Sequence, residues 1–224
     1  MKGMFAELYA LWKREDLLSK ALKNIDTIFE EDKEMFVLAY NSLITNKDEN
    51  AEVVEMREQK VDSLTCDTRK KIAEYLATHT HPDISASLVL TSVIVDLERI
   101  GDISLDIQRL ELLYPKDLEG GTLTPELNHL HERILQVFDL TQEAFRDSKP
   151  VVAEQALNLT SSIETQCKNV FEKLWNSKKM NTQEVIVYAL TLRYFVRVTR
   201  HLHNIATSVT NPFHRIGYVD GEES

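Results

Sequence analysis

The stretch VLTSVIVDLERIGDISLDIQRL, residues 89–110, repeats apolar side chains at the three-to-four-residue spacing of an amphipathic helix. Within it, Glu98 and Asp102 are four residues apart, which places them about 40° from each other around the helix axis. Ile94 and Leu105 fall within a similar arc. The stretch therefore predicts a long helix on which two carboxylates share a stripe with apolar residues.

The same periodicity extends over most of the chain, and no sustained alternation of apolar and polar residues indicates a strand. Only six Gly and five Pro occur among 224 residues, which favours long helices over a turn-rich β fold. Breaks rich in Pro, Gly, Asn and Asp separate the helical segments. We predict a short N-terminal helix and six long helices, at about 4–13, 16–45, 49–77, 83–113, 125–146, 150–176 and 182–210.

The clearest break is LYPKDLEGGTLTPEL, residues 113–127, which contains two Pro and two Gly. There, Thr124 and Pro125 are typical of an N-cap followed by the first helical residue. An internal repeat supports a division at this point, because LERIGDISLDI (97–107) aligns with FVRVTRHLHNI (195–205). We predict an all-α protein of two tandem three-helix bundles, with the first bundle at 1–113, a linker at 114–124 and the second bundle at 125–224.

Composition narrows the class of protein. The net charge of −10, from 26 basic and 36 acidic residues, argues against nucleic-acid binding, which relies on Lys and Arg. No apolar stretch approaches the roughly 18–20 residues that span a bilayer, and the N-terminus lacks a signal-peptide pattern. Cys66 and Cys167 lie far apart without a CxxC partner, so we interpret them as reduced thiols. We expect a cytoplasmic protein without a membrane span.

A second acidic pair, Glu58 and Asp62, lies on the preceding predicted helix with the same spacing, and Val54 and Thr65 flank it on the same face. Two such pairs on successive antiparallel helices can converge into a cluster of four carboxylates. The carboxylates of that cluster would repel one another, and a divalent or trivalent cation would relieve the repulsion. Hard oxygen ligands suit Mg²⁺, Ca²⁺, Mn²⁺ and iron.

The alternative is that each acidic pair lines a solvated helix face, where Arg57, Lys60 or Arg99 neutralises it. Other patterns of chemistry are weaker. A ferritin-like site needs two Glu-x-x-His motifs, and only Glu126 with His129 fits. No Gly-rich phosphate loop, GxSxG motif or Cys–His nucleophile pair occurs. We interpret four further histidines as surface or capping residues: His79, His81, His201 and His203.

The sequence DLERIGDISLDI, residues 96–107, resembles the DLERIGDHAxNIAE signature of the PhoU family, the phosphate-uptake regulators. The predicted helix before it resembles the E-x-x-x-D helix of that family. The resemblance implies two tandem three-helix bundles and a bound metal, with iron as the metal, although Mg, Mn, Ca and Zn also suit carboxylates. Asp106 replaces the family's Asn as an additional candidate ligand. The metal ligands that the resemblance implies are Glu58, Asp62, Glu98 and Asp102.

The resemblance also implies a function. It predicts a non-enzymatic, cytoplasmic regulator of phosphate uptake and phosphate signalling that acts through protein–protein contacts. The partners would be components of a phosphate transporter or the sensor kinase associated with it, and a homodimer is the family's habit. Two alternatives stay open: a metal-dependent enzyme that uses the carboxylate cluster, and a metal-free structural bundle. No acid or base that an enzyme would need is identifiable beside Glu98.

The repeat gives one further prediction that does not come from the family. Asp62 and Asp102 in the first half align with Glu164 and Arg200 in the second. A guanidinium supplies fixed positive charge, so it can neutralise a carboxylate without an ion. We predict a direct contact between Glu164 and Arg200 and no metal in the second bundle. The alternative is that both side chains point into solvent.

Overall fold

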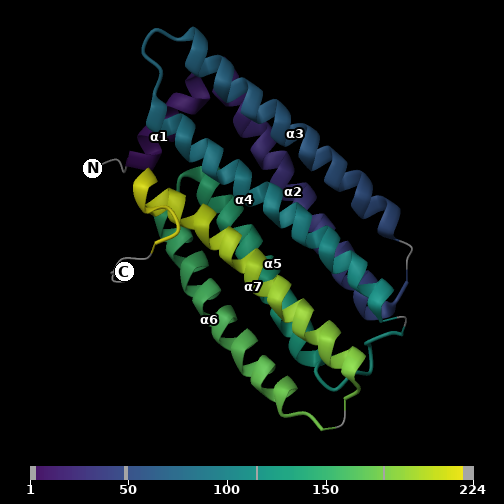
Figure 1. Cartoon of the computed structure of the whole chain (residues 1–224). Coiled ribbons are helices and arrows are strands. Elements are labelled where there is room, and N and C mark those ends of the chain that lie inside the picture. Colours follow the sequence, from purple (N-terminus) through teal and green to yellow (C-terminus); the bar gives the residue numbers. More distant parts are fainter. Residues whose placement is uncertain (1–3, 48–49, 115, 179, 219–224) are drawn as a thin grey trace.

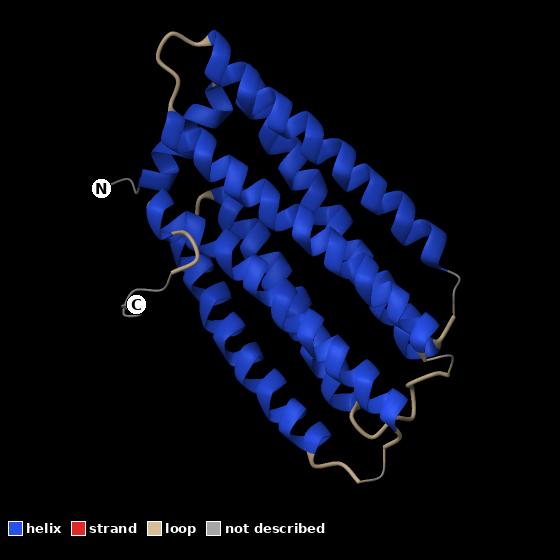
Figure 2. Cartoon of the chain, in the orientation of Figure 1, coloured by secondary structure: helices blue, strands red, loops and turns tan. Residues whose placement is uncertain are grey.

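The computed structural model describes residues 4–47, 50–114, 116–178 and 180–218. Over these residues the regular structure is entirely helical, which confirms the predicted all-α class (Figure 2). The described residues include the short 3-10 helices η2 (Leu110–Leu113) and η3 (Phe213–Arg215). The α-helices are α1 (Met4–Arg14), α2 (Asp16–Thr45), α3 (Ala51–Thr78), α4 (Ile84–Arg109), α5 (Thr124–Asp147), α6 (Pro150–Trp175) and α7 (Thr182–Thr210).

The six long helices form two three-helix bundles that lie side by side (Figure 1). Helices α2, α3 and α4 pack on one another to form the first bundle, and α5, α6 and α7 form the second. The bundles meet where α4 packs on α7 and α2 packs on α5. Only six of the 28 residues of α3 are buried, against 14 of the 26 in α4, so α3 is an outer helix and α4 an inner one.

The interface between the bundles is an apolar core with stacked rings. His131 of α5 stacks on Tyr40 of α2 with ring centroids 4.2 Å apart, and Phe36 lies 5.0 Å from the same imidazole. Phe195 of α7 packs against Phe36 at 5.6 Å. Because the imidazole is almost fully enclosed, burial lowers the pKa of His131 to about 4. One continuous core therefore crosses from the first bundle to the second.

Most predicted helix boundaries agree with the structure to within two residues, and two differences have a structural cause. The predicted helix 83–113 ends at Arg109 and continues as the 3-10 helix η2. Thr124 was expected to cap α5 but lies inside it, and Leu123 is the capping residue. The Thr124 hydroxyl donates to the carbonyl of Leu118 and accepts a hydrogen bond from the Tyr188 hydroxyl at 2.8 Å. A hydroxyl engaged in these contacts is not available to cap a helix.

The start of α7 is fixed by a capping box. The Asn181 side chain accepts a hydrogen bond from the backbone N–H of Glu184, and the Glu184 carboxylate accepts one from the backbone N–H of Asn181, both at 2.9 Å. This reciprocal arrangement satisfies two N–H groups that the first helical turn leaves unpaired. It sets the register of the helix that carries Arg200.

Two further features of the chain follow from the structure. Cys66 is exposed and Cys167 is buried, and both are free thiols, as predicted. In the part of the chain that the structure describes, every helix is either too short or too polar to cross a membrane.

Candidate functional site

The four predicted metal ligands lie where the outer helix α3 packs on α4. Glu58 and Asp62 are on α3, and Glu98 and Asp102 are on α4. Asp62 is exposed, and the other three are half-buried. Beside the two acids of α3, the apolar side chain of Val61 is buried against the core.

Three of the four carboxylates share one electrostatic environment. Burial raises the pKa of the Glu58 carboxyl, and the negative charges of Asp62 and Asp102 raise it further against a smaller opposing effect of Arg109. Since Asp102 lies on α4, the two helices bring acids from both sides within electrostatic reach. A cation at this point would stabilise the ionised carboxylates.

Glu98 lies farther along the line of contact between α3 and α4. Arg69 of α3 donates from Nη2 to Oε2 of Glu98. Arg69 is eleven residues beyond Glu58, which corresponds to about 16 Å along the helix axis. The structure therefore brings Glu58, Asp62 and Asp102 into one group and places Glu98 beside a cation instead.

Asp102 also has a basic partner. Arg99 donates from Nη1 to Oδ2 of Asp102 at 2.8 Å, with the two side chains 53% and 39% exposed. In the described part of the chain, no three His, Cys, Asp or Glu side chains converge closely enough to hold a metal ion. A full ligand set would require Asp102 to leave Arg99 and Glu98 to leave Arg69. The oxygen donors suit a hard cation, but their present positions do not form a closed shell.

Two of the basic residues expected to neutralise the predicted ligands have another partner. Arg57 and Lys60 of α3 bind opposite oxygens of Glu31 on α2, at 2.5 and 2.6 Å. Burial alone would raise the pKa of Glu31, but the hydrogen bonds from Lys60 and Arg57 lower it on balance. Glu58 and Asp62 are therefore not neutralised by these two cations.

A buried carboxyl that was not among the predicted site residues is that of Asp32 on α2. Its side chain is 0% exposed, and neither of its oxygens has a hydrogen-bond partner among the described residues. Burial raises the pKa of Asp32 well above its ordinary value, and the charges of Glu31 and Asp102 act in the same direction. The sequence does contain a pattern that indicates burial of Asp32. Asp32 falls three residues after Phe29 and four before Phe36, on the apolar stripe of its helix.

Gly101, between Glu98 and Asp102 on α4, has little room for a side chain because Asp32 lies close to it. A Cβ added at Gly101 would stand 3.1 Å from Oδ1 of Asp32 and 3.5 Å from Cγ1 of Val61. Glycine in a helix interior costs about 1 kcal/mol relative to alanine. Here the missing side chain lets α2 and α3 approach α4 closely, at the level of Asp102.

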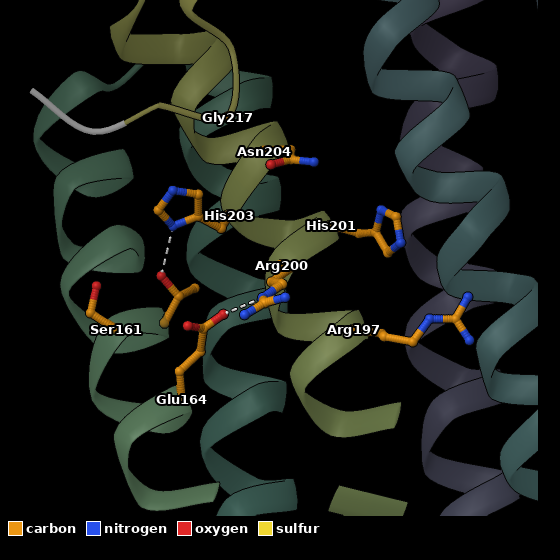
Figure 3. Close-up of a pocket in the computed structure, with 9 residues that line it drawn as sticks. Ser161, Glu164, Arg197, Arg200, His201, His203, Asn204 and Gly217 are labelled. Atoms are coloured by element: carbon orange, nitrogen blue, oxygen red, sulfur yellow. Dashed lines mark hydrogen bonds and ion pairs between the residues drawn. The ribbon is translucent and has the colours of Figure 1, made fainter. Parts of the chain in front are cut away.

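In the second bundle, the predicted contact between Glu164 and Arg200 is confirmed. Arg200 of α7 donates from Nε to Oε1 of Glu164 on α6 at 2.8 Å (Figure 3). The side chains are 60% and 39% exposed. The pair thus occupies the position that aligns with Asp62 and Asp102 in the first bundle.

This ion pair lies in a pocket of about 530 Å³ between α6, α7 and the segment that follows α7 (Figure 3). The pocket is polar on nearly every side. Asp96 of α4 is hydrogen-bonded to two of the lining residues, to His201 Nδ1 at 2.8 Å and to Asn204 Nδ2 at 3.1 Å. The pocket is lined by Thr160, Ser161, Glu164, Arg197, Arg200, His201, His203, Asn204 and Gly217.

The histidines of α7 differ from the sequence interpretation. His201 and His203 were expected at the surface or at caps, but both are half-buried. Because the Asp96 carboxylate can only accept, Nδ1 of His201 carries the proton of their hydrogen bond. His203 Nδ1 lies 3.0 Å from the Thr160 hydroxyl. By contrast, His79 is the C-cap residue of α3, as expected.

The fold defines the class of protein. Crystal structures of PhoU from Pseudomonas aeruginosa and of the phosphate transport system regulatory protein PhoU from Streptococcus pneumoniae superpose on this chain with TM-scores of 0.76 in both cases. The identities are 18% and 15%, and each alignment covers 86% of this chain and 95% or 92% of the other chain. At these identities the likeness establishes the fold alone, the double three-helix bundle of PhoU.

The sequence adds a match to a domain family over part of the chain. Residues 25–110 match the family model of the PhoU domain, which spans α3, α4 and most of α2. A search of curated protein sequences finds no significant match. Residues 25–110 are therefore similar to a PhoU domain, and the chain as a whole has the fold of the PhoU structures.

Proposed function

We propose that this chain regulates phosphate transport through protein–protein contacts in the cytoplasm, without catalysing a reaction itself. The observation that carries the proposal is the PhoU domain match at residues 25–110, joined to the PhoU fold over most of the chain. The partner would be a component of a phosphate transporter or the sensor kinase associated with it. The chain would act as a homodimer.

The exposed face of α6 supports a role in docking. Trp175 is 80% exposed and Phe171 is 45% exposed, and the two rings are four residues apart on one side of the helix. Aromatic side chains are enriched in protein interfaces, where they supply large contact areas. Val53 and Met56 on the outer helix α3 are also exposed, at 41% and 70%, but neither side chain is aromatic.

Binding assays test this part of the proposal. The immobilised chain should bind a purified transporter component or the cytoplasmic part of the sensor kinase. Replacing Phe171 and Trp175 together by Ala should weaken that binding, because truncated aromatic anchors commonly cost 2 kcal/mol or more, roughly thirtyfold in affinity. The matched control replaces Val53 and Met56 by Ala on the other outer helix. Absence of binding to either class of partner would contradict the proposal.

We further propose that a divalent or trivalent cation, with iron preferred, binds at the carboxylates of the α3–α4 seam. The raised pKa of Glu58 supports the site, because the neighbouring acids Asp62 and Asp102 leave excess negative charge there. Glu98 completes the proposed ligand set if Arg69 releases it. The carboxylates would supply hard oxygen ligands to the ion.

Metal analysis of protein purified without added metal or chelator tests the site. Asp62→Asn combined with Asp102→Asn should abolish bound metal, since two anionic ligands are lost without a change of shape. Glu98→Ala with Asp102→Ala should do the same. Asp67→Asn is the matched control, because Asp67 is also on α3 but is paired with Lys71. Undiminished metal in the first double variant would refute the assignment.

A further inference from the structure

We propose that the pocket between α6 and α7 binds a small phosphate oxyanion, either inorganic phosphate or a phosphomonoester. The inference goes beyond the proposed function and does not rest on it, because it uses only the pocket of the second bundle and the side chains that hold it. The pocket has a volume of about 530 Å³. Small-molecule sites have volumes of roughly 300–1,000 Å³, so a phosphate group with a small organic substituent fits.

The residues that line the pocket carry more positive than negative charge, whereas the whole chain is acidic. Two arginines, Arg197 and Arg200, line the pocket against one carboxylate, Glu164. The Arg200 side chain is turned toward Glu164 and that of Arg197 away from it (Figure 3). A second carboxylate, Asp96, lies behind the pocket wall on His201 and Asn204. The whole chain has a net charge of −10, from 26 basic and 36 acidic residues. A metal cation would be repelled by two arginines, whereas an anion would be attracted.

The arginines have donors that their existing contacts do not use. The hydrogen bond of Arg200 to Glu164 engages Nε, and 60% of the Arg200 side chain is exposed. Arg197 makes no ion pair within the described residues, and its guanidinium lies 5.9 Å from the ring centroid of Tyr194. The planar fork of a guanidinium matches two oxygens of a phosphate group.

Other polar groups of the pocket are held in place before a ligand arrives. Asp96 holds His201 and Asn204 from the side of α4. Gly217, with φ of +88°, brings the backbone so close to Asn204 that a Cβ there would stand 3.2 Å from its Oδ1. Side chains that are already ordered lose less conformational entropy on binding.

The internal repeat shows that the second bundle has a guanidinium where the first has a carboxylate. Arg200 occupies the position that aligns with Asp102 in the first bundle. Exchange of a carboxylate for a guanidinium at equivalent positions converts a site that attracts cations into one that attracts anions.

Calorimetric titration of the purified full chain with potassium phosphate tests the proposal, in a phosphate-free buffer held at constant ionic strength with NaCl. The wild type should bind at millimolar phosphate. Arg197→Gln combined with Arg200→Gln should weaken binding by about tenfold or more, because hydrogen bonds to charged groups are worth about 1.5–3 kcal/mol. The matched control is Arg193→Gln, which removes an exposed arginine of α7 that does not line this pocket.

A gain-of-affinity variant sharpens the test. Glu164→Gln should strengthen phosphate binding, because it removes the carboxylate of the pocket and weakens its hold on Arg200. The proposal is overturned if the wild type shows no phosphate-dependent heat, if Arg193→Gln weakens binding as much as the double variant, or if Glu164→Gln does not strengthen it. Retained helical circular dichroism of each variant shows that it is folded.

A parallel titration with AMP distinguishes the two sources of the phosphate group. Tighter binding of AMP would assign the pocket to a phosphomonoester, and tighter binding of inorganic phosphate would assign it to the free ion. Either result supports the oxyanion site. Since the titration uses purified protein and no partner, its failure would leave the regulatory proposal standing, and the reverse also holds.

Discussion

Arg200 on α7 and Glu164 on α6 form a direct ion pair, with Nε and Oε1 2.8 Å apart, at the position where the first bundle carries two acids. The two side chains are 60% and 39% exposed, so solvent screens their attraction. We predict a coupling energy below about 1 kcal/mol in a double-mutant cycle. The cycle combines Arg200→Ala and Glu164→Ala, with urea unfolding as the measurement. A coupling of several kcal/mol would show that the pair is shielded in solution.

The buried carboxyl of Asp32 should make stability depend on pH. Its folded-state pKa is raised, so the folded protein binds a proton that the unfolded chain releases above about pH 4. The free energy of unfolding should therefore fall as pH rises from about 4 towards the folded pKa. Asp32→Asn removes this loss, and at pH 7 we expect it to be at least about 1 kcal/mol more stable than the wild type.

Urea unfolding of both proteins between pH 4 and pH 8, after treatment with a chelator, measures the effect. The difference in unfolding free energy between Asp32→Asn and the wild type should widen with pH. A constant difference would mean that Asp32 does not titrate abnormally.

The effect of Gly101→Ala on the free energy of unfolding should change sign when Asp32 is replaced. In the wild type, Gly101→Ala places a methyl group 3.1 Å from Oδ1 of Asp32, and we expect a loss of stability. With Asp32→Ala in the background that oxygen is gone, and the same substitution should stabilise by up to about 1 kcal/mol through helix propensity. Thermal or urea unfolding of the four proteins measures both effects. Equal effects in the two backgrounds would contradict the close approach.

The buried His131 should make the free energy of unfolding depend on pH in the opposite direction from Asp32. Its pKa is lowered to about 4 by burial, against about 6.5 in an unfolded chain. The unfolded chain therefore binds the extra proton between these values, and stability is full above pH 6.5 and falls as pH drops towards 4. The loss should approach about 3 kcal/mol.

His131→Phe keeps a ring against Phe36 and Tyr40 but cannot titrate, so its stability should lack this loss. Comparison with the wild type over pH 4–7 isolates the effect from that of Asp32, which is the same in both proteins. An imidazole that titrates near pH 6.5 in the folded protein, measured by NMR, would contradict the prediction.

Much of the fold could be predicted from the sequence because local signals and long-range packing agree. The predicted helices 16–45 and 182–210 have the bounds observed for α2 and α7. The repeat also predicted the contact between Glu164 and Arg200, since equivalent helix positions face each other in both bundles. Thr124 was misplaced because its hydroxyl binds Tyr188, 64 residues away, and no local pattern reveals that contact.

The candidate sites were less predictable because side-chain pairing depends on helix register. The spacing of Glu98 gives its helix face, but only the register of α3 against α4 places it beside Arg69. Likewise, nothing local shows that His201 meets Asp96 across the interface between bundles. Asp32 was overlooked because an acid beside Glu31 looks like part of a charged surface run.

We propose that this chain, which carries a PhoU domain match and the PhoU fold, regulates phosphate transport. The most direct test is the rate of radiolabelled phosphate uptake by cells of the source organism, with and without the chain, under phosphate-replete and phosphate-starved conditions. Cells lacking the chain should lose the difference in uptake between the two conditions, and expression of the chain should restore it. Uptake in cells without the chain that equals that of the parent strain under both conditions would contradict the claim.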